Sequence, residues 1–206
     1  MTPVEVQTSS GLTVRIRRAT PGDEEALLVG FSHLSEQSRY NRFFTALPRL
    51  SGRLLEQLID VDGHARLALA TFDPARPSEV GGPDGFGIAV ARYIQPDPTV
   101  PEAELAIAII DEYQRTGLGE VLLTALEVVA RANDLERLYA ILLGLNVGMT
   151  RLLIRHGGAL VHDPEDDVGV RRYVLDLTID PADHADPALV EALAPLADAG
   201  APPLDR

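Results

Sequence analysis

The sequence lacks several residue types, and each absence excludes a class of protein or site. Its 206 residues include no cysteine and no tryptophan. Without cysteine the chain forms neither disulfides nor thiolate metal sites, which fits a cytoplasmic protein. No apolar run approaches the roughly 20 residues that a membrane-spanning helix needs. The opening MTPVEVQTSSG also lacks the basic and apolar segments of a secretory signal. We therefore expect no association with a membrane.

Positive charge is also scarce. Asp and Glu number 31 against 18 Lys and Arg, which gives a formal net charge of −13. Such a field repels nucleic acid and attracts a cationic substrate, although acidity more often serves only solubility. We therefore expect no nucleic-acid partner. A local basic patch remains able to bind the phosphates of a small anionic ligand.

What is present is an ordinary globular composition, with 46% hydrophobic and 24% charged residues. The length suits one domain with a terminal extension. We expect that domain at residues 10–178. The remainder, residues 179–206, is rich in Ala, Pro and Asp and is predicted to be a loose tail with at most one or two amphipathic turns within residues 187–196.

The spacing of apolar residues predicts strands and helices in turn. Alternation, as in TVRIRR, is typical of a half-buried strand, whereas Leu118, Val121, Leu122 and Leu126 recur at helical spacing. The stretch DPARPSEVGGPDG predicts a hairpin loop. We expect strands at residues 13–18, 66–72, 86–94, 104–110, 136–142 and 170–177, and helices at residues 21–31, 35–44, 54–59, 117–133 and 147–156. This order predicts an α+β fold with a mixed, mostly antiparallel central sheet flanked by helices.

The most informative stretch is ELAIAIIDEYQRTGLG at residues 104–119. It predicts a strand, a glycine-containing turn and the start of a helix, where unpaired amides and the helix dipole favour a bound phosphate. Glycine lets backbone approach a ligand, and Arg115 can add a charged hydrogen bond. Taken alone, Q-x-x-G-x-G more often marks a plain glycine-rich turn before a helix, and it is the surrounding strand, turn and helix that favour an anion site. Other phosphate motifs fit worse, because G-x-x-x-x-G-K-[ST] is absent and Leu122 replaces the third glycine of G-x-G-x-x-G.

The run from Gln114 to Gly119 resembles the pyrophosphate loop of the GNAT superfamily of N-acetyltransferases. Asn146 stands where that family often places an asparagine facing the pantetheine arm, and the order of elements from Val14 to Leu177 also matches the family. LSEQSRYNRFF at residues 34–44 and AELAIAIIDEYQRTGLG at residues 103–119 resemble the bacterial protein-lysine acetyltransferase branch. No ligand-sensing domain of the kind that some members of that branch carry is evident.

The resemblance implies a GNAT fold that binds acetyl-CoA as a co-substrate. It implies that backbone groups at residues 107–109 meet the pantetheine and that backbone amides at residues 115–120 hold the pyrophosphate. Arg155 either reaches a CoA phosphate or is an ordinary exposed arginine. The residues expected to contact acetyl-CoA are Ile107, Ala108, Ile109, Gln114, Arg115, Thr116, Gly117, Leu118, Gly119, Glu120, Asn146 and Arg155. Independently, Ala106 and Ala108 share one strand face with Glu104, and such small side chains either leave room for a ligand or fill a shallow sheet face.

Acetyl transfer to a lysine needs a neutral amine, whose usual pKa is near 10.4, so a carboxylate base is expected near the thioester. In the lysine-acetyltransferase branch a glutamate at the position of Glu104 is the general base, and Glu102 is the second candidate. The alternative is that Glu104 is an ordinary solvated carboxylate. Many family members protonate the departing thiolate with a tyrosine, but Leu153 occupies that position. Water, Tyr113 or Tyr139 remain as proton donors.

Other chemistry-bearing residues predict less. The five histidines show no metal-ligand spacing, so surface or loop roles and no metal are expected. They are His33, His64, His156, His162 and His184. Ser-His-Asp chemistry lacks a G-x-S-x-G elbow. The aromatic residues Tyr40, Phe43 and Phe44 either line an acceptor site or belong to the core.

The sequence therefore predicts an acetyl-CoA-dependent N-acetyltransferase, with a protein lysine as the expected acceptor. One alternative acceptor is a small amine such as a polyamine, an amino sugar or an antibiotic. A second alternative is a domain that senses acyl-CoA or regulates a partner without turnover, which Leu153 favours and Glu104 disfavours. The oligomeric state is left open.

Overall fold

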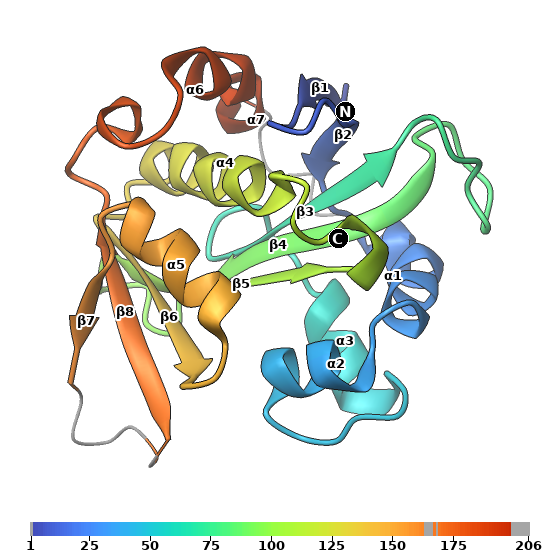
Figure 1. Ribbon diagram of the computed structural model, residues 1–206, viewed down its shortest axis with the longest axis horizontal. Coiled ribbons are helices and arrows are strands. Elements are labelled where there is room, and N and C mark those ends of the chain that lie inside the picture. Colours follow the sequence, from blue (N-terminus) through green and yellow to red (C-terminus); the bar gives the residue numbers. More distant parts are fainter. Residues whose placement is uncertain (1, 163–166, 168, 199–206) are drawn as a thin grey trace.

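The computed structural model describes residues 2–162, 167 and 169–198 and contains one mixed sheet of eight strands. The strands lie in the order β1-β2-β3-β4-β5-β6-β8-β7 (Figure 1), and every neighbouring pair is antiparallel except β5 and β6. The strands are β1 (Val4–Gln7), β2 (Thr13–Arg18), β3 (Arg66–Asp73), β4 (Phe86–Ile94), β5 (Glu102–Ile109), β6 (Arg137–Leu143), β7 (Ala159–Val161) and β8 (Val170–Asp176). The predicted α+β fold with a mostly antiparallel sheet is confirmed.

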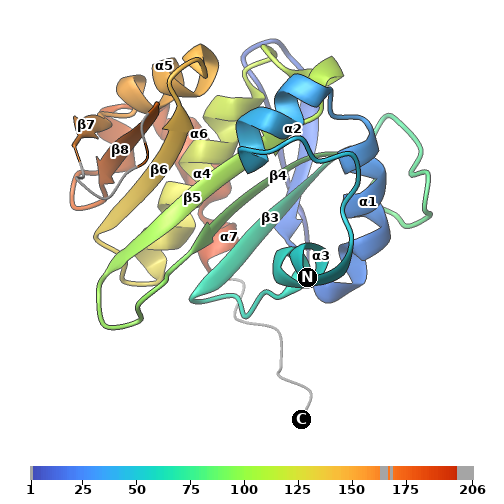
Figure 2. The same cartoon turned by 90° about the horizontal axis from the view of Figure 1, so that it is seen from below.

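Helices cover both faces of this sheet (Figures 1 and 2). One face carries α1 (Glu24–Ser32), α2 (Glu36–Phe43) and α3 (Gly52–Ile59). The other carries α4 (Leu118–Ala132), with α6 (Pro187–Leu193) and α7 (Pro195–Asp198) packed against it. Helix α5 (Val147–Arg155) lies beside the start of α4. Three short 3-10 turns complete the structure: η1 (Pro21–Asp23) precedes α1, η2 (Asp111–Tyr113) precedes the loop that leads into α4, and η3 (Pro181–Asp183) precedes α6. None of the helices in the described part of the chain is long and apolar enough to cross a membrane.

The apolar patterns explain this layering. Val14 and Ile16 of the alternating strand β2 are fully buried. Strand β3 is buried at nearly every position because helices cover both of its faces. Helix α4 buries Leu118, Val121 and Leu122 against the sheet. The strand β5, which leads into α4, buries Ala103 and Leu105 and leaves its later residues partly exposed.

The C-terminal segment is the main departure from the sequence expectation. The composition of residues 179–206 predicts a loose tail, yet Leu193 and Leu196 are buried. Arg18, itself buried, donates to the carbonyl oxygens of Leu196 and Ala197 at 3.1 Å each. A charged side chain that satisfies helix-end carbonyls fixes this segment. Residues 199–206 lie outside the described residues. Strands β1 and β7 are also additions to the predicted elements.

Candidate active site

Strands β5 and β6 separate after a short paired stretch. Their parallel pairing covers Glu102, Ala103 and Glu104, which face Arg137 to Tyr139, and no further pair forms between these two fully described strands. Beyond Glu104 the two strands point in different directions (Figure 1). The edge of β5 at residues 106–109 therefore has backbone groups with no strand partner on the β6 side. A buried backbone group needs a partner, so this edge is suited to an elongated polar ligand.

The loop before α4 presents a row of free amides. Arg115 and Gly117 both have left-handed backbones, with φ of 62° and 84°. The backbone amides of residues 115–119 have no hydrogen-bond partner within the described chain, whereas the Glu120 amide donates to the Gly117 carbonyl at 3.1 Å. Consecutive amides of this kind, at the N-terminus of a 15-residue helix, form an anion-binding concavity. The free row thus ends one residue earlier than the predicted range of 115–120.

The two glycines of this loop are explained by the protein around them. A Cβ at Gly117 would lie 2.3 Å from the Ser9 Oγ, and the positive φ strains any other residue. A Cβ at Gly119 would lie 3.2 Å from the Leu152 side chain of α5. At both positions a side chain would point into the protein rather than toward a ligand. Glycine here sets the loop conformation and the approach of α5 to α4.

Asp111 ties this loop to α2. Its carboxylate accepts hydrogen bonds from the Ser35 amide at 2.9 Å, the Ser35 hydroxyl at 2.7 Å and the Ser38 hydroxyl at 3.1 Å. The Gln114 amide group donates to the Ser38 Oγ and to the Ile109 carbonyl, both at 3.1 Å. Burial opposes ionisation of Asp111, but these hydrogen bonds prevail and lower its pKa. Gln114 therefore shapes the loop, and the two sequence stretches that resemble the protein-lysine acetyltransferase branch meet here.

Glu104 lies at the last paired position before β5 and β6 separate, and its side chain is exposed. Glu102, the second candidate base, is held in an ion pair with the Arg137 Nε at 2.9 Å. Glu104 instead interacts through its charge with the partly buried Arg42 and the buried Arg92. It forms no side-chain hydrogen bond among the described residues. Burial, together with the charge of Arg42, lowers the pKa of Arg92 to about 10, although Asp60 and Glu104 oppose the shift. The geometry favours Glu104 over Glu102 as a free carboxylate.

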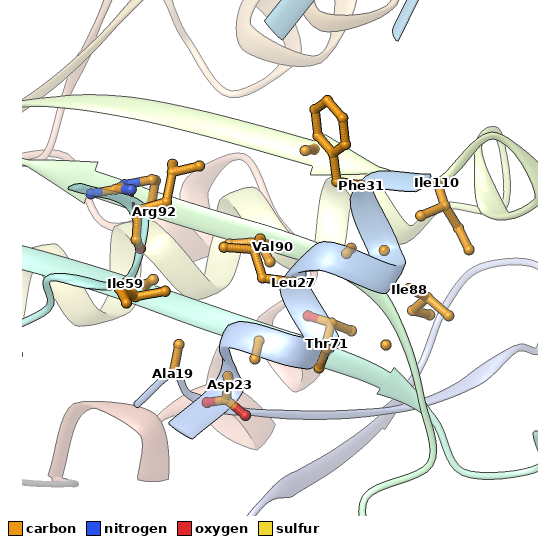
Figure 3. A pocket seen from close by; sticks show the side chains of 18 of the residues that line it. Ala19, Asp23, Leu27, Phe31, Ile59, Thr71, Ile88, Val90, Arg92 and Ile110 are labelled. Atoms are coloured by element: carbon orange, nitrogen blue, oxygen red, sulfur yellow. Dashed lines mark hydrogen bonds between the residues drawn. The ribbon is translucent and has the colours of Figure 1, made fainter. Parts of the chain in front are cut away.

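An apolar cavity lies on the sheet face covered by α1, α2 and α3 (Figure 3), and its lining on β5 begins at Ala106, two residues beyond Glu104. Ala106 and Ala108 form part of its wall, which fits the interpretation that small side chains leave room on this side of β5. Arg92 lies near Ile59 at one end, and its Nε has no hydrogen-bond partner within the described chain. Of the aromatic residues on α2 and just after it, Phe43 lines the cavity, whereas Tyr40 and Phe44 are 45% and 41% exposed.

The candidate proton donors have different surroundings. Leu153 is fully buried in the core. The Tyr113 hydroxyl donates to the Asp73 carboxylate at 2.7 Å. Tyr139 pairs with Glu104 across the two strands, and the Arg172 guanidinium lies 4.8 Å from its ring. Burial and the charge of Glu104 raise the pKa of Tyr139. Tyr139 is therefore the tyrosine nearest to the strand separation, with its proton retained at neutral pH.

Asn146 and Arg155 stand at the two ends of α5. The Asn146 Oδ1 accepts from the Met149 amide at 3.2 Å and caps the helix, while its amide nitrogen has no partner among the described residues. Arg155 donates to Glu120 at 3.3 Å and keeps 66% of its side chain exposed. Both positions are compatible with contacts to a ligand lying along the loop and α5. Their predicted roles stay predictions.

The expectation of surface or loop roles is wrong for His156, whereas His184 lies in the turn after η3 and is partly buried. His156 is 2% exposed, and its two ring nitrogens lie 2.8 Å from Glu120 and 2.9 Å from Glu127. His184, partly buried, lies 2.8 Å from the other oxygen of Glu127. Burial favours a neutral ring, but the two carboxylates prevail and raise the pKa of His156 to about 9. Sequence spacing misses this cluster because α4, α5 and the C-terminal segment meet only in the fold. A signal exists in Glu120 and Glu127, which lie two helical turns apart on α4.

Comparison with known proteins agrees with this geometry. Residues 84–157 match the family model described as Acetyltransferase (GNAT) family. Acetyltransferase Pat of Mycolicibacterium smegmatis is 29% identical over 195 residues, which cover 94% of this chain and 54% of that protein. The chain thus spans about half the length of that relative. Acetyltransferase PA5475 of Pseudomonas aeruginosa is 30% identical over 162 residues, covering 78% of this chain and 82% of that protein. The GNAT domain of S. lividans PAT matches with a TM-score of 0.73 and 29% identity, covering 84% of this chain and 96% of that domain.

Proposed function

Because the chain belongs to the GNAT family of acetyltransferases, we propose that it transfers an acetyl group from acetyl-CoA to the side-chain amine of a protein lysine. The observation that carries the proposal is the position of Glu104 on β5, just before the residues that contribute to two binding features. One feature is the unpaired edge of β5 together with the free amides of residues 115–119. The other is the apolar cavity beneath α1, α2 and α3, which Ala106 and Ala108 of the same strand line.

The co-substrate is proposed to lie along the separated strands. Its diphosphate meets the amides of residues 115–119, where the positive end of α4 stabilises negative charge. Its pantetheine amides pair with the β5 backbone at Ile107, Ala108 and Ile109, and the Asn146 amide at the start of α5 is proposed to contact the same arm. This arrangement brings the thioester to the point where β5 and β6 part, beside Glu104.

Glu104 is proposed to accept the proton of the lysine ammonium, directly or through one water. The neutral amine then attacks the thioester carbonyl carbon, and the C–S bond breaks as the nitrogen loses its second proton to water and the amide forms. The thiolate takes a proton from water or from Tyr139. Glu104 suits the role because its side chain is exposed, whereas Glu102 is neutralised by Arg137.

A lysine acceptor is supported by the likeness to Acetyltransferase Pat and to the PAT domain of S. lividans. Arg42 and Arg92 beside Glu104 add a constraint on the acceptor. Like charges close together are unfavourable, so this site disfavours a small polycation such as a polyamine. We propose that the preferred lysine has acidic rather than basic neighbours in its own sequence.

The test is release of free CoA thiol from acetyl-CoA in the presence of lysine peptides and a panel of small amines. The chain contains no lysine, since all 18 of its Lys and Arg residues are arginine, so acetyl-lysine detected in the assay belongs to the acceptor. We expect release with a lysine peptide flanked by Asp or Glu, and slower release when Arg flanks the lysine. Release only with small amines would identify the alternative acceptor. No release with any acceptor, despite acetyl-CoA binding, would support a sensing domain.

A further inference from the structure

Three side chains from distant parts of the sequence meet below the surface. Glu127 comes from α4, His156 ends α5 and His184 follows η3. Glu127 and His156 are 1% and 2% exposed, and His184 is partly buried. The His156 Nδ1 lies 2.9 Å from one Glu127 oxygen, and the His184 Nε2 lies 2.8 Å from the other. The three donor atoms lie within 4.8 Å of one another.

Two imidazoles and a carboxylate are a common ligand set for divalent transition metals. Metal–ligand bonds of roughly 2.0–2.1 Å in a tetrahedral site place neighbouring ligand atoms about 3.3 Å apart. The two histidine–Glu127 separations, to different oxygens of Glu127, are shorter by about half an ångström, and the three donor atoms together lie within 4.8 Å, so small side-chain rotations are needed to close the site around an ion. The His184 side chain is 15% exposed, so water can reach the site.

The surroundings of His156 also match a metal ligand. A ligating histidine usually donates its second ring N–H to a carboxylate, which fixes the tautomer and the ring orientation. The His156 Nε2 lies 2.8 Å from the Glu120 Oε1, and the other Glu120 oxygen accepts from Arg155 at 3.3 Å. This arrangement directs the His156 Nδ1 toward Glu127 and His184, so that it can coordinate once its proton has left.

We propose that Glu127, His156 and His184 form a binding site for one divalent transition-metal ion, with Zn²⁺ as the probe. Binding displaces the proton shared between His156 and Glu127 to the buffer, and both histidines then coordinate as neutral rings. The site joins α4, α5 and the C-terminal segment, and it lies on the helix whose first turn presents the free amides. It revises the sequence expectation that no metal binds, and it does not rest on the proposed reaction.

A hydrogen-bonded cluster with a protonated His156 is the competing arrangement, and two measurements separate it from a metal site. The full chain without a polyhistidine tag is treated with EDTA and then titrated with Zn²⁺ by calorimetry and with Co²⁺ by absorption spectroscopy. We expect one ion per chain and the intense visible bands of four-coordinate Co²⁺. At 100-fold excess over the dissociation constant, Zn²⁺ should raise the Tm by about 5–10 °C.

The informative variant is His184→Gln, because a glutamine amide can still donate to Glu127 but is a poor metal ligand. It should keep the metal-free Tm within about 2 °C and lose the Zn²⁺-induced rise. His64→Gln, at an exposed histidine before β3, is the matched control and should keep the rise. A Zn²⁺-induced rise unchanged in His184→Gln would overturn the proposal. The absence of saturable 1:1 binding, or a weak octahedral Co²⁺ spectrum, would also overturn it. Both are measured on the unaltered chain, so they do not depend on the folding of a variant.

Discussion

Glu104 and Tyr139 face each other at the last paired position between β5 and β6. Up to this pair the sheet is continuous, and beyond it the β5 backbone has no strand partner on that side among the described residues. The pair therefore marks the end of the paired sheet and the proposed place of the reacting thioester. One member is an exposed carboxylate, and the other is a buried phenol whose pKa is raised. A carboxyl and a phenol at one position suit a base and an acid.

Replacing Glu104 by glutamine should remove the general base while keeping the shape of the side chain. We expect kcat to fall by about 10²–10³-fold, with little change in the Kd for acetyl-CoA. Steady-state kinetics and calorimetry measure the two quantities. Glu102→Gln is the control and should retain most activity, because Glu102 is committed to Arg137. If both variants turned over like the unaltered chain, Glu104 would not be the base.

Tyr139→Phe tests the proton donor. If Tyr139 supplies the proton to the thiolate, its loss should lower kcat by about tenfold or more and remove the alkaline limb of the pH–rate profile. Tyr113→Phe removes a hydroxyl that is already bonded to Asp73 and should leave that limb in place. Equal profiles for Tyr139→Phe and the unaltered chain would assign protonation to water.

Gly117→Ala tests the loop conformation. The new Cβ would lie 2.3 Å from the Ser9 Oγ at a φ of 84°, so the loop must shift or store strain. We expect a cost of about 1–2 kcal/mol in unfolding free energy and weaker binding of acetyl-CoA, by about tenfold or more. Denaturant unfolding and calorimetry give both values. Gly148→Ala is the control, since nothing lies within 4 Å of a Cβ there. Unchanged acetyl-CoA affinity in Gly117→Ala would show that the loop conformation does not govern binding.

The Arg17–Asp23 pair predicts a dependence of stability on pH. Two guanidinium nitrogens donate to Asp23 at 2.7 and 2.8 Å, and the Thr20 amide donates at 2.7 Å. Burial opposes ionisation of Asp23, but these bonds prevail and lower its pKa below 3.8. The stabilisation that accompanies a lowered pKa is present above the unfolded-state value and is lost as pH falls through the folded-state value.

Asp23→Asn should therefore reduce the unfolding free energy at pH 7 by about 1–3 kcal/mol. The difference from the unaltered chain should shrink as pH falls below about 4. Urea unfolding at several pH values measures it, with the exposed Asp134→Asn as a control. A constant difference down to about pH 2 would show that ionisation of Asp23 is not the source of the stabilisation.

The sequence predicts local features well, but it predicts contacts between segments that are distant in the sequence poorly. The alternation around Val14 and the helical spacing after Leu118 each arise within a single element, which has one buried and one solvent-facing side. The predicted strands and helices therefore form close to their expected bounds. Strand β7 is only three residues long, and its pairing with β8 is not evident from its own composition. The helices after residue 180 depend on Arg18, which is distant in the sequence.

The same distinction holds within the site. The loop at Gly117 is evident in the sequence because its glycines and the following helix are contiguous, but the reasons for both glycines lie in Ser9 and Leu152. The separation of β5 from β6 and the freedom of Glu104 relative to Glu102 require the strand register and the position of Arg137. The histidine cluster requires three elements to meet.

The central claim is that the diphosphate of acetyl-CoA binds the free amides before α4. An amide-resolved NMR titration of the ¹⁵N-labelled chain with acetyl-CoA tests it directly, with NAD as the comparison ligand. We predict large, saturable shifts for the amides of residues 115–119 and for Ile107 to Ile109, and no such shifts with NAD. Saturable acetyl-CoA binding that left the amides of residues 115–119 unshifted would contradict the account.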